Sequence, residues 1–194
     1  MENKETILYF ITGNSHKFRE VKEIFKREDI CYNLRNKNLM PIEIQAESIR
    51  DVALYKLNSL KNEMNESFFI EDAGFFVDNP LNGFPGVYSS YIFKTIGNEG
   101  VLKLINNFNQ TKAHFSAVIA LYFKPLEKIF LFEGKVNGKV SEKPLGKSGF
   151  GFDPIFIPDA IPDRTFAELS LEEKNSISHR GQALRLLIKL LKEN

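Results

Sequence analysis

The sequence contains little cysteine, little histidine and no long apolar segment. Cys31 is the single cysteine among 194 residues, which excludes an internal disulfide and a zinc site built on cysteines, and which fits a reducing compartment. The three histidines, His16, His114 and His179, are too scattered to favour a three-histidine metal centre. The first apolar stretch ends at Thr12, so it is too short for a signal peptide or a membrane span. We therefore expect a cytoplasmic protein with no membrane partner.

The charges nearly cancel. Lys and Arg number 26 and Asp and Glu number 25, for a formal net charge of +1. No global field then draws the chain to nucleic acid, so we expect no nucleic-acid partner and only local phosphate binding. A hydrophobic fraction of 43% is typical of a globular chain, and the length predicts a single domain over residues 1–194.

The first half of the sequence alternates between β-type and helical patterns. A run of β-formers at residues 7–11 ends in a turn at 12–14, and Ser15 is a candidate N-cap of the helix that follows. Weaker strands are predicted near residues 31–34 and 40–44. A helix is then predicted over 48–64, followed by a buried strand at 67–70.

The second half predicts a helix over residues 97–108 and two long β segments at 113–123 and 129–140. Residues 124–128 join these segments as a hairpin loop, which indicates antiparallel pairing. A last helix carries apolar residues at i, i+3, i+4 and i+7 from Leu184. The predicted fold class is α/β with a mixed sheet.

The turn Thr12–Lys17 lies between a strand and a helix. Backbone N–H groups and a helix dipole of about half a charge attract an anion there, and Lys17 adds a point charge. The turn lacks the second glycine of a Walker A loop. Taken alone, the segment favours an ordinary capped turn, and phosphate is its candidate ligand if the turn is functional.

Glu71 and Asp72 follow three apolar residues, and further acidic residues lie at 40–47. Mg²⁺ is usually held by one or two carboxylates together with waters and substrate phosphates. Such a carboxylate can also remove a proton from water. The alternative is that both residues are solvated loop carboxylates at the end of a strand.

Residues 146–154 alternate glycines with Phe150 and Phe152 before Asp153. Either ring could stack on a purine while the carboxylate reads its polar edge, although a structural turn would carry the same residues. Lys174, His179 and Arg180 then concentrate donors at the start of the last helix, as nucleotide recognition requires.

Four segments in this order and spacing resemble the inosine triphosphate pyrophosphatase family: TGNSHK, EDAGFFVDNPLNGFPGVYS, SGFGFDPIF and EKNSISHRGQAL. The resemblance implies an elongated mixed sheet flanked by helices, in two lobes with the active-site cleft between them. It implies a homodimer that uses Mg²⁺ to hydrolyse ITP, dITP and XTP to the monophosphate and pyrophosphate. Removal of these non-standard purine nucleotides keeps them out of DNA and RNA.

The same resemblance assigns roles to residues. Asp72 and Lys17 would be catalytic, and Glu43 and Asp72 would bind the metal. Glu47 is a rival to Glu43, because either carboxylate of PIEIQAE could be the ligand. The remaining substrate contacts implied are Thr12, Gly13, Asn14, Ser15, His16, Lys56, Ala73, Phe150, Gly151, Phe152, Asp153, Lys174, His179 and Arg180.

The mechanism expected from these roles is attack of water on the α-phosphorus, with Asp72 as general base and with Lys17 and Lys174 stabilising phosphate charge. Discrimination is expected at the purine 6-position, where a carbonyl would face donors from His179 or Arg180. GTP shares that carbonyl, so its exclusion must involve the 2-amino group.

Overall fold

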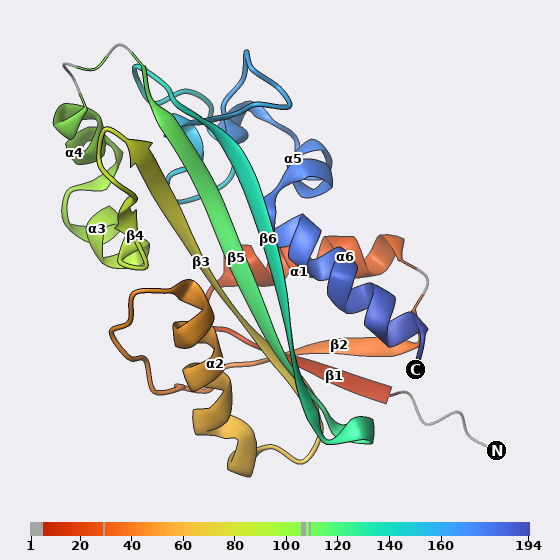
Figure 1. Cartoon of the computed structure of the whole chain (residues 1–194). Coiled ribbons are helices and arrows are strands. Elements are labelled where there is room, and N and C mark those ends of the chain that lie inside the picture. Colours follow the sequence, from red (N-terminus) through yellow and green to blue (C-terminus); the bar gives the residue numbers. More distant parts are fainter. Residues whose placement is uncertain (1–5, 29, 106–107, 109) are drawn as a thin grey trace. The chain divides into compact units, whose positions relative to one another are not determined.

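The computed structural model describes residues 6–28, 30–105, 108 and 110–194. Within these residues, the strands form one seven-stranded sheet in the order β2-β1-β3-β5-β6-β7, with β4 paired to β3 (Figure 1). The strands are β1 (Thr6–Ile11), β2 (Tyr32–Lys37), β3 (Ser67–Asn79), β4 (Phe84–Gly86), β5 (Lys112–Phe123), β6 (Lys128–Val140) and β7 (Phe156–Pro158). Strand β1 runs parallel to β2 and β3, whereas β4 and β7 pair antiparallel with their neighbours. The predicted mixed α/β sheet is confirmed.

The helices are α1 (Ser15–Arg27), α2 (Ile49–Leu60), α3 (Ser89–Thr95), α4 (Gly97–Leu104), α5 (Leu171–Ile177) and α6 (His179–Lys192). Short 3₁₀ turns lie at Lys61–Glu63, Lys124–Leu126, Asp153–Ile155 and Phe166–Glu168. In the described ranges, none of the helices is both long enough and apolar enough to cross a membrane.

The chain divides into two compact units. The first unit holds Met1–Asp72, Val118–Glu133 and Ala183–Asn194, and the second holds Ala73–Ala117 and Gly134–Gln182. Strands β3, β5 and β6 each contribute residues to both units. The division of β3 falls between Asp72 and Ala73, next to a predicted catalytic residue.

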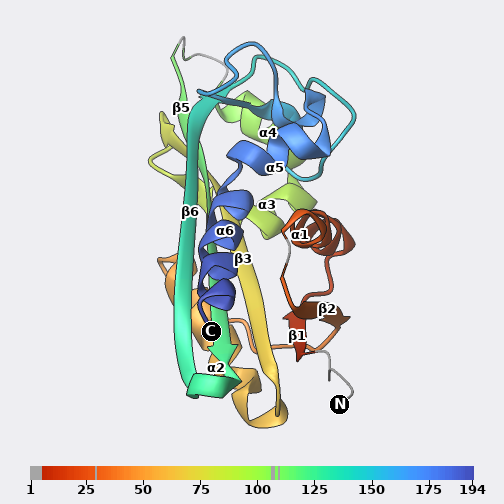
Figure 2. The ribbon, with the colours of Figure 1, turned by 90° about the vertical axis from the view of Figure 1, so that its right-hand side faces the viewer.

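The core of the first unit lies where α1 and the C-terminal part of α6 pack on the sheet. Helix α1 buries Val21, Ile24 and Phe25 because these residues recur at helical spacing. They pack in one cluster with Phe69 of β3 and with the apolar face of α6, which runs along the sheet (Figure 2). This packing fixes the start of α1 beside β3.

The core of the second unit is aromatic. Phe75, Phe115, Phe156 and Phe166 form a cluster whose ring centroids lie 4.9–6.0 Å apart. Rings at these separations in tilted and edge-to-face arrangements add to the stabilisation from burial. The loop that follows β6 is therefore anchored on a rigid base.

Two predicted elements are absent or shorter in the structure. The strand predicted near residues 40–44 is wrong, because residues 38–47 form no strand or helix. Met40 is 94% exposed and Ile42 is 61% exposed, so this stretch has no buried face for a sheet to cover. The helix predicted over 97–108 is α4 alone, which ends at Leu104, and residues 106 and 107 lie outside the described residues.

Candidate active site

The turn between β1 and α1 is organised by Asn14. Its Oδ1 accepts hydrogen bonds from the backbone N–H groups of His16 at 3.0 Å and Lys17 at 3.1 Å, so Asn14 is the N-cap. The prediction that Ser15 is the cap is wrong by one position, because Ser15 is already helical. The Asn14 N–H donates to Thr12 Oγ1 at 3.1 Å. An anion at this helix start would share the first-turn donors with the Asn14 side chain.

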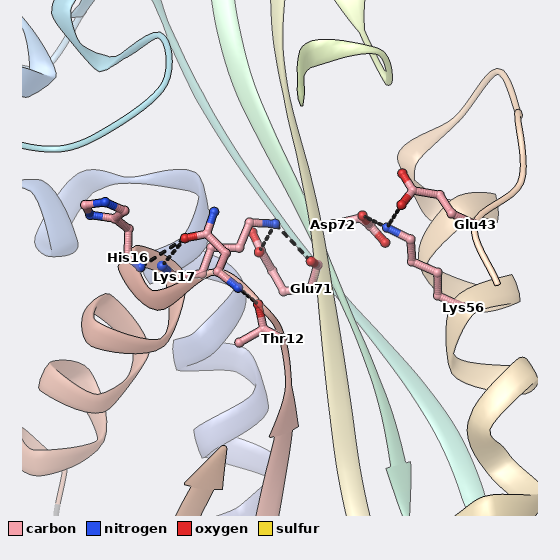
Figure 3. Close-up of polar contacts among 8 residues, drawn as sticks. Thr12, His16, Lys17, Glu43, Lys56, Glu71 and Asp72 are labelled. Carbon is pink, nitrogen blue, oxygen red and sulfur yellow. Dashed lines mark hydrogen bonds and ion pairs between the residues drawn. The ribbon is translucent and has the colours of Figure 1, made fainter. Parts of the chain in front are cut away.

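Glu71 and Asp72 lie inside a strand, not at its exit as predicted. Strand β3 continues through both residues to Asn79. Because successive side chains of a strand point to opposite faces, the two carboxylates separate. Figure 3 shows Glu71 on the side of α1, toward Lys17, and Asp72 on the side of α2, toward Lys56.

Lys17 is anchored to β3 through Glu71. Its Nζ lies 2.7 Å from Glu71 Oε2 and donates to the Glu71 carbonyl oxygen at 3.1 Å. The Glu71 side chain is fully buried. Sequence reasoning identified Lys17 but missed Glu71 as its partner. The period-2 pattern of the strand, which places Glu71 on the face of Phe69, was the signal that could have found it.

Asp72, Lys56 and Glu43 form one chain of ionic contacts on the other face of β3. Lys56 Nζ lies 2.6 Å from Asp72 Oδ1 and 3.1 Å from Glu43 Oε2 (Figure 3). Helix α2 supplies Lys56, and the exposed 38–47 loop supplies Glu43. Glu47 is exposed and directly precedes Ser48, the N-cap of α2. Of the two rival carboxylates, Glu43 is the one that the structure connects to Asp72.

The surroundings of Asp72 make its carboxylate harder to ionise than that of an exposed aspartate. Burial raises the pKa of this carboxyl group above its ordinary value, against the opposing charges of Lys17 and Lys56. Burial by itself would lower the pKa of Lys56, but Asp72 and Glu43 outweigh it and raise that pKa. Asp72 Oδ2 is buried and has no hydrogen-bond partner among the described residues. Lys56 thus holds one oxygen of the carboxylate in place, and the other oxygen is left to accept a proton.

The donor set suits a magnesium ion shared with a ligand. Among the described residues, no group of three or more His, Cys, Asp or Glu side chains is placed to hold a metal. Mg²⁺ does not require such a group, because one or two carboxylates suffice when waters and phosphates complete its shell. Asp72 and Glu43 fit that requirement, because one cation, the Lys56 ammonium group, already lies within 3.1 Å of a carboxylate oxygen of each.

The second unit contains another ion pair, between Asp153 and Lys174. Asp153 Oδ2 lies 2.6 Å from Lys174 Nζ and accepts a hydrogen bond from the Phe150 N–H at 2.7 Å. Gly149 has a φ of +72°, and a Cβ there would lie 2.2 Å from Asp153 Oδ2. Only glycine fits that position. Asp153 therefore fixes the shape of the loop at residues 146–154, which we call the base loop.

Phe150 and Phe152 lie in different surroundings. Lys174 Nζ lies 5.0 Å and Arg180 Cζ lies 5.5 Å from the centroid of the Phe150 ring, within cation–π range. Phe152 is buried and stacks on Phe75 in the core, with centroids 5.0 Å apart. Phe150 is thus the ring grouped with the basic residues, and Phe152 anchors the base loop.

His179 and Arg180 are both buried at the start of α6. The His179 ring stacks on Phe115 at 4.8 Å, with an interplanar angle of 9°. The structure thus groups Phe150, Asp153, Lys174 and Arg180 within the second unit. Lys17 and the Lys56–Asp72 pair lie in the first unit, and Ala73 adjoins Asp72 in β3. The roles of these residues toward a substrate stay predictions.

Asn98 was missed by sequence reasoning. Its Nδ2 donates to the Gly151 carbonyl oxygen at 3.2 Å, from α4 to the base loop. No sequence signal would have found this contact, because a lone asparagine in the first turn of a short helix resembles any polar surface residue.

The fold of the chain is similar to that of solved Ham1 proteins. A HAM1 protein from Coxiella burnetii superposes with a TM-score of 0.83 at 29% identity, covering 97% of this chain and 100% of that one. The Ham1 protein from Staphylococcus aureus gives a TM-score of 0.80 at 28% identity, with coverages of 97% and 99%.

The Ham1 family model matches residues 8–190, and the chain belongs to the Ham1 family. It is similar to the dITP/XTP pyrophosphatase of Thermococcus kodakarensis, with 46% identity over 187 residues, covering 96% of this chain and 98% of the relative. It is also similar to the dITP/XTP pyrophosphatase of Pyrococcus horikoshii, with 44% identity and coverages of 96% and 97%. These findings confirm the resemblance seen in the sequence motifs.

Proposed function

We propose that the protein hydrolyses deaminated purine nucleoside triphosphates, namely ITP, dITP and XTP, to the monophosphate and pyrophosphate. Membership of the Ham1 family and the names of the relatives support the reaction. The single observation that carries the chemistry is the buried, unpartnered Oδ2 of Asp72, whose other oxygen is fixed by Lys56. In this proposal, that oxygen accepts the proton of the attacking water.

Asp72 acts as the general base in this mechanism. Water attacks the α-phosphorus, its proton passes to Asp72 Oδ2, and the bond to the β-phosphate oxygen breaks so that pyrophosphate leaves. The burial that raises the pKa of Asp72 makes its carboxylate a stronger base. Lys17 and Lys56, whose charges reach Asp72, stabilise the negative charge on the phosphates.

Glu43 and Asp72 would hold the Mg²⁺ ion. When bound, the ion would neutralise phosphate charge and polarise the phosphate oxygens. Lys56, which is paired to both carboxylates, is the proposed phosphate contact on α2. Thr12, Gly13, Asn14, Ser15 and His16 supply the remaining proposed phosphate contacts around the start of α1.

The base loop and the start of α6 recognise the purine in this proposal. Phe150 provides the stacking ring, and Arg180 or His179 donates to the 6-carbonyl of a deaminated purine. Adenine presents an amino donor at that position, so donors there disfavour ATP. Lys174, held 2.6 Å from Asp153, keeps positive charge beneath the Phe150 ring.

A substrate panel tests the proposed function. The purified protein is incubated with Mg²⁺ and ITP, dITP, XTP, GTP, ATP, dTTP or UTP, and pyrophosphate and orthophosphate are quantified separately. We expect pyrophosphate release from the first three substrates. Dominant orthophosphate release, or equal hydrolysis of all seven, would overturn the proposal.

Two further features belong to the same proposal. We propose that the protein is a homodimer and that it acts on free nucleotides in the cytoplasm. Light scattering coupled to size-exclusion chromatography would give about twice the mass of one chain for a dimer, whereas the mass of one chain would contradict it.

A further inference from the structure

The Ser148 N–H ties the base loop to the Ala167 carbonyl oxygen at 3.0 Å, and two further hydrogen bonds hold its backbone at Phe150 and Gly151. On one side, the Phe150 N–H donates to Asp153 Oδ2 at 2.7 Å, a contact within the loop itself. On the other side, the Gly151 carbonyl oxygen accepts a hydrogen bond from Asn98 Nδ2 at 3.2 Å. These two bonds bracket the Phe150–Gly151 segment. Of these two bonds, the one from Asn98 comes from outside the loop, from the first turn of α4.

Gly151 gives this second contact its importance. Its φ is +63°, and the space where a Cβ would lie is open. The Phe150 carbonyl oxygen accepts a hydrogen bond from the Asp153 N–H at 3.2 Å. A glycine in open space changes φ at little steric cost, so local sterics alone do not fix the next peptide, between Gly151 and Phe152. A hydrogen bond to its carbonyl oxygen restricts that rotation and, with it, the direction of the Phe150 ring.

The side of the base loop that faces α3 and α4 carries a second contact. Phe93 of α3 meets Phe152 edge-to-face, with ring centroids 5.4 Å apart. Phe152 is already held by Phe75 in the core, so this contact supports the anchored part of the loop. Asn98 supports the neighbouring part that carries Phe150. The two helices therefore support adjacent positions of the loop through different residues.

Of the two polar atoms of the Asn98 side-chain amide, Nδ2 is hydrogen-bonded and Oδ1 is not. Asn98 Oδ1 is buried and has no hydrogen-bond partner among the described residues. A buried acceptor left unsatisfied costs about 1–3 kcal/mol, comparable to or larger than the net gain from one neutral hydrogen bond. The residue therefore adds little net stability, although it fixes the Gly151 carbonyl group.

We infer that Asn98 is a positioning residue for purine recognition, which it serves by holding the Gly151 carbonyl and thereby the Phe150 ring. The inference rests on the proposed function, since it assigns the base loop to the purine. Asn98 touches no reacting atom in this account. Its loss should weaken binding of the base and leave the chemical step unchanged.

The test compares Asn98→Ala and Asn98→Asp with wild type and with Glu99→Ala, an exposed neighbour in the same helix. Alanine removes the whole amide, whereas aspartate is nearly isosteric and replaces the donor by a carboxylate oxygen, which repels the Gly151 carbonyl oxygen. For ITP with Mg²⁺, we expect KM to rise about 3- to 10-fold in both Asn98 variants, as for one lost hydrogen bond. We expect kcat to stay within about twofold and the melting temperature to stay near that of wild type. Glu99→Ala should match wild type.

Binding of IMP, measured by calorimetry on the same four proteins, provides a readout independent of turnover. Its Kd should rise by the same factor in both Asn98 variants. An unchanged KM and Kd in folded Asn98→Asp would overturn the inference, as would a fall in kcat and melting temperature without a rise in KM. If wild type releases no pyrophosphate from ITP but IMP binding still depends on Asn98, the proposed reaction fails and the positioning role stands.

Discussion

Each unit of the molecule contains an aspartate–lysine pair, and the two pairs have the same separation. Asp72 and Lys56 lie 2.6 Å apart in the first unit, and Asp153 and Lys174 lie 2.6 Å apart in the second. The first pair is 17% and 13% exposed, whereas both members of the second are 3% exposed. Asp153 Oδ2 also accepts from a backbone N–H, but Asp72 Oδ2 has no partner among the described residues.

This difference separates a reactive pair from a structural one. A buried ion pair offsets its desolvation only when further hydrogen bonds satisfy its atoms, as they do at Asp153. Asp72 lacks that compensation, and burial raises its pKa accordingly. We therefore expect the chemistry at Asp72, whose second oxygen has no hydrogen-bond partner among the described residues. We expect Asp153 to maintain the conformation of the base loop.

The largest effect should come from Asp72→Asn, which removes the proposed base and keeps the side-chain shape. We expect kcat for ITP to fall by about 10²–10⁴, the usual contribution of a general base, with a much smaller change in KM. Pyrophosphate release under steady-state conditions measures both parameters. Asp159→Asn, at an exposed position, is the matched control. Near-normal turnover in Asp72→Asn would remove Asp72 from the mechanism.

For the free energy of unfolding, the Asp153–Lys174 pair should matter more than the Asp72–Lys56 pair. Lys174→Met leaves Asp153 as an uncompensated buried charge, so the free energy of unfolding should fall by about 3–5 kcal/mol. Lys56→Met should cost about 1–2 kcal/mol, because Asp72 is more exposed and the charge of Lys17 still reaches it. Urea denaturation of both variants makes the comparison. Equal losses would mean that the two pairs do not differ as described.

Metal dependence should distinguish Glu43 from Glu47. Glu43→Gln removes a charged ligand, so the Mg²⁺ concentration for half-maximal activity should rise about tenfold, as for one lost charge-assisted interaction. Glu47→Gln should shift it by less than about twofold, because the exposed Glu47 lies just before the N-cap of α2. Titration of Mg²⁺ at saturating ITP gives both values. A larger shift for Glu47→Gln would reverse the assignment.

The smallest effect concerns the pH dependence of stability in EDTA. The pKa of Asp72 is higher in the folded chain than its ordinary value of 3.8, so the folded state binds more protons between the two values. Wild type should therefore lose stability relative to Asp72→Asn as pH rises from about 4 through the folded pKa, and the gap should then stay constant. Urea midpoints across this range measure it. A wild type that gained stability over the variant would contradict the burial argument.

Local patterns in the sequence predicted much of the fold. The stripe of Val21, Ile24 and Phe25 predicted α1, and two long β segments predicted β5, β6 and the mixed sheet. The strand near residues 40–44 was wrong because short apolar runs do not reveal whether a neighbouring strand exists to pair with them. The motif resemblance identified the family, which the comparisons confirm.

Local sequence patterns could not predict which side chains contact one another in the candidate site. Lys17 and Glu71 are 54 residues apart, and Lys174 and Asp153 are 21 apart. Their pairing depends on how β3 lies beside α1 and how the base loop folds back toward α5, and no local propensity records either. The same is true of Asn98 and Gly151, at a separation of 53 residues.

Hydrolysis of ITP in water enriched in ¹⁸O tests the central claim most directly, because the label reports which phosphorus the water attacks. Attack at the α-phosphorus, with Asp72 accepting the proton, predicts the label in IMP and none in pyrophosphate. Mass spectrometry of both products after a single turnover would show it. Label in pyrophosphate would place the attack at the β-phosphorus and contradict the account.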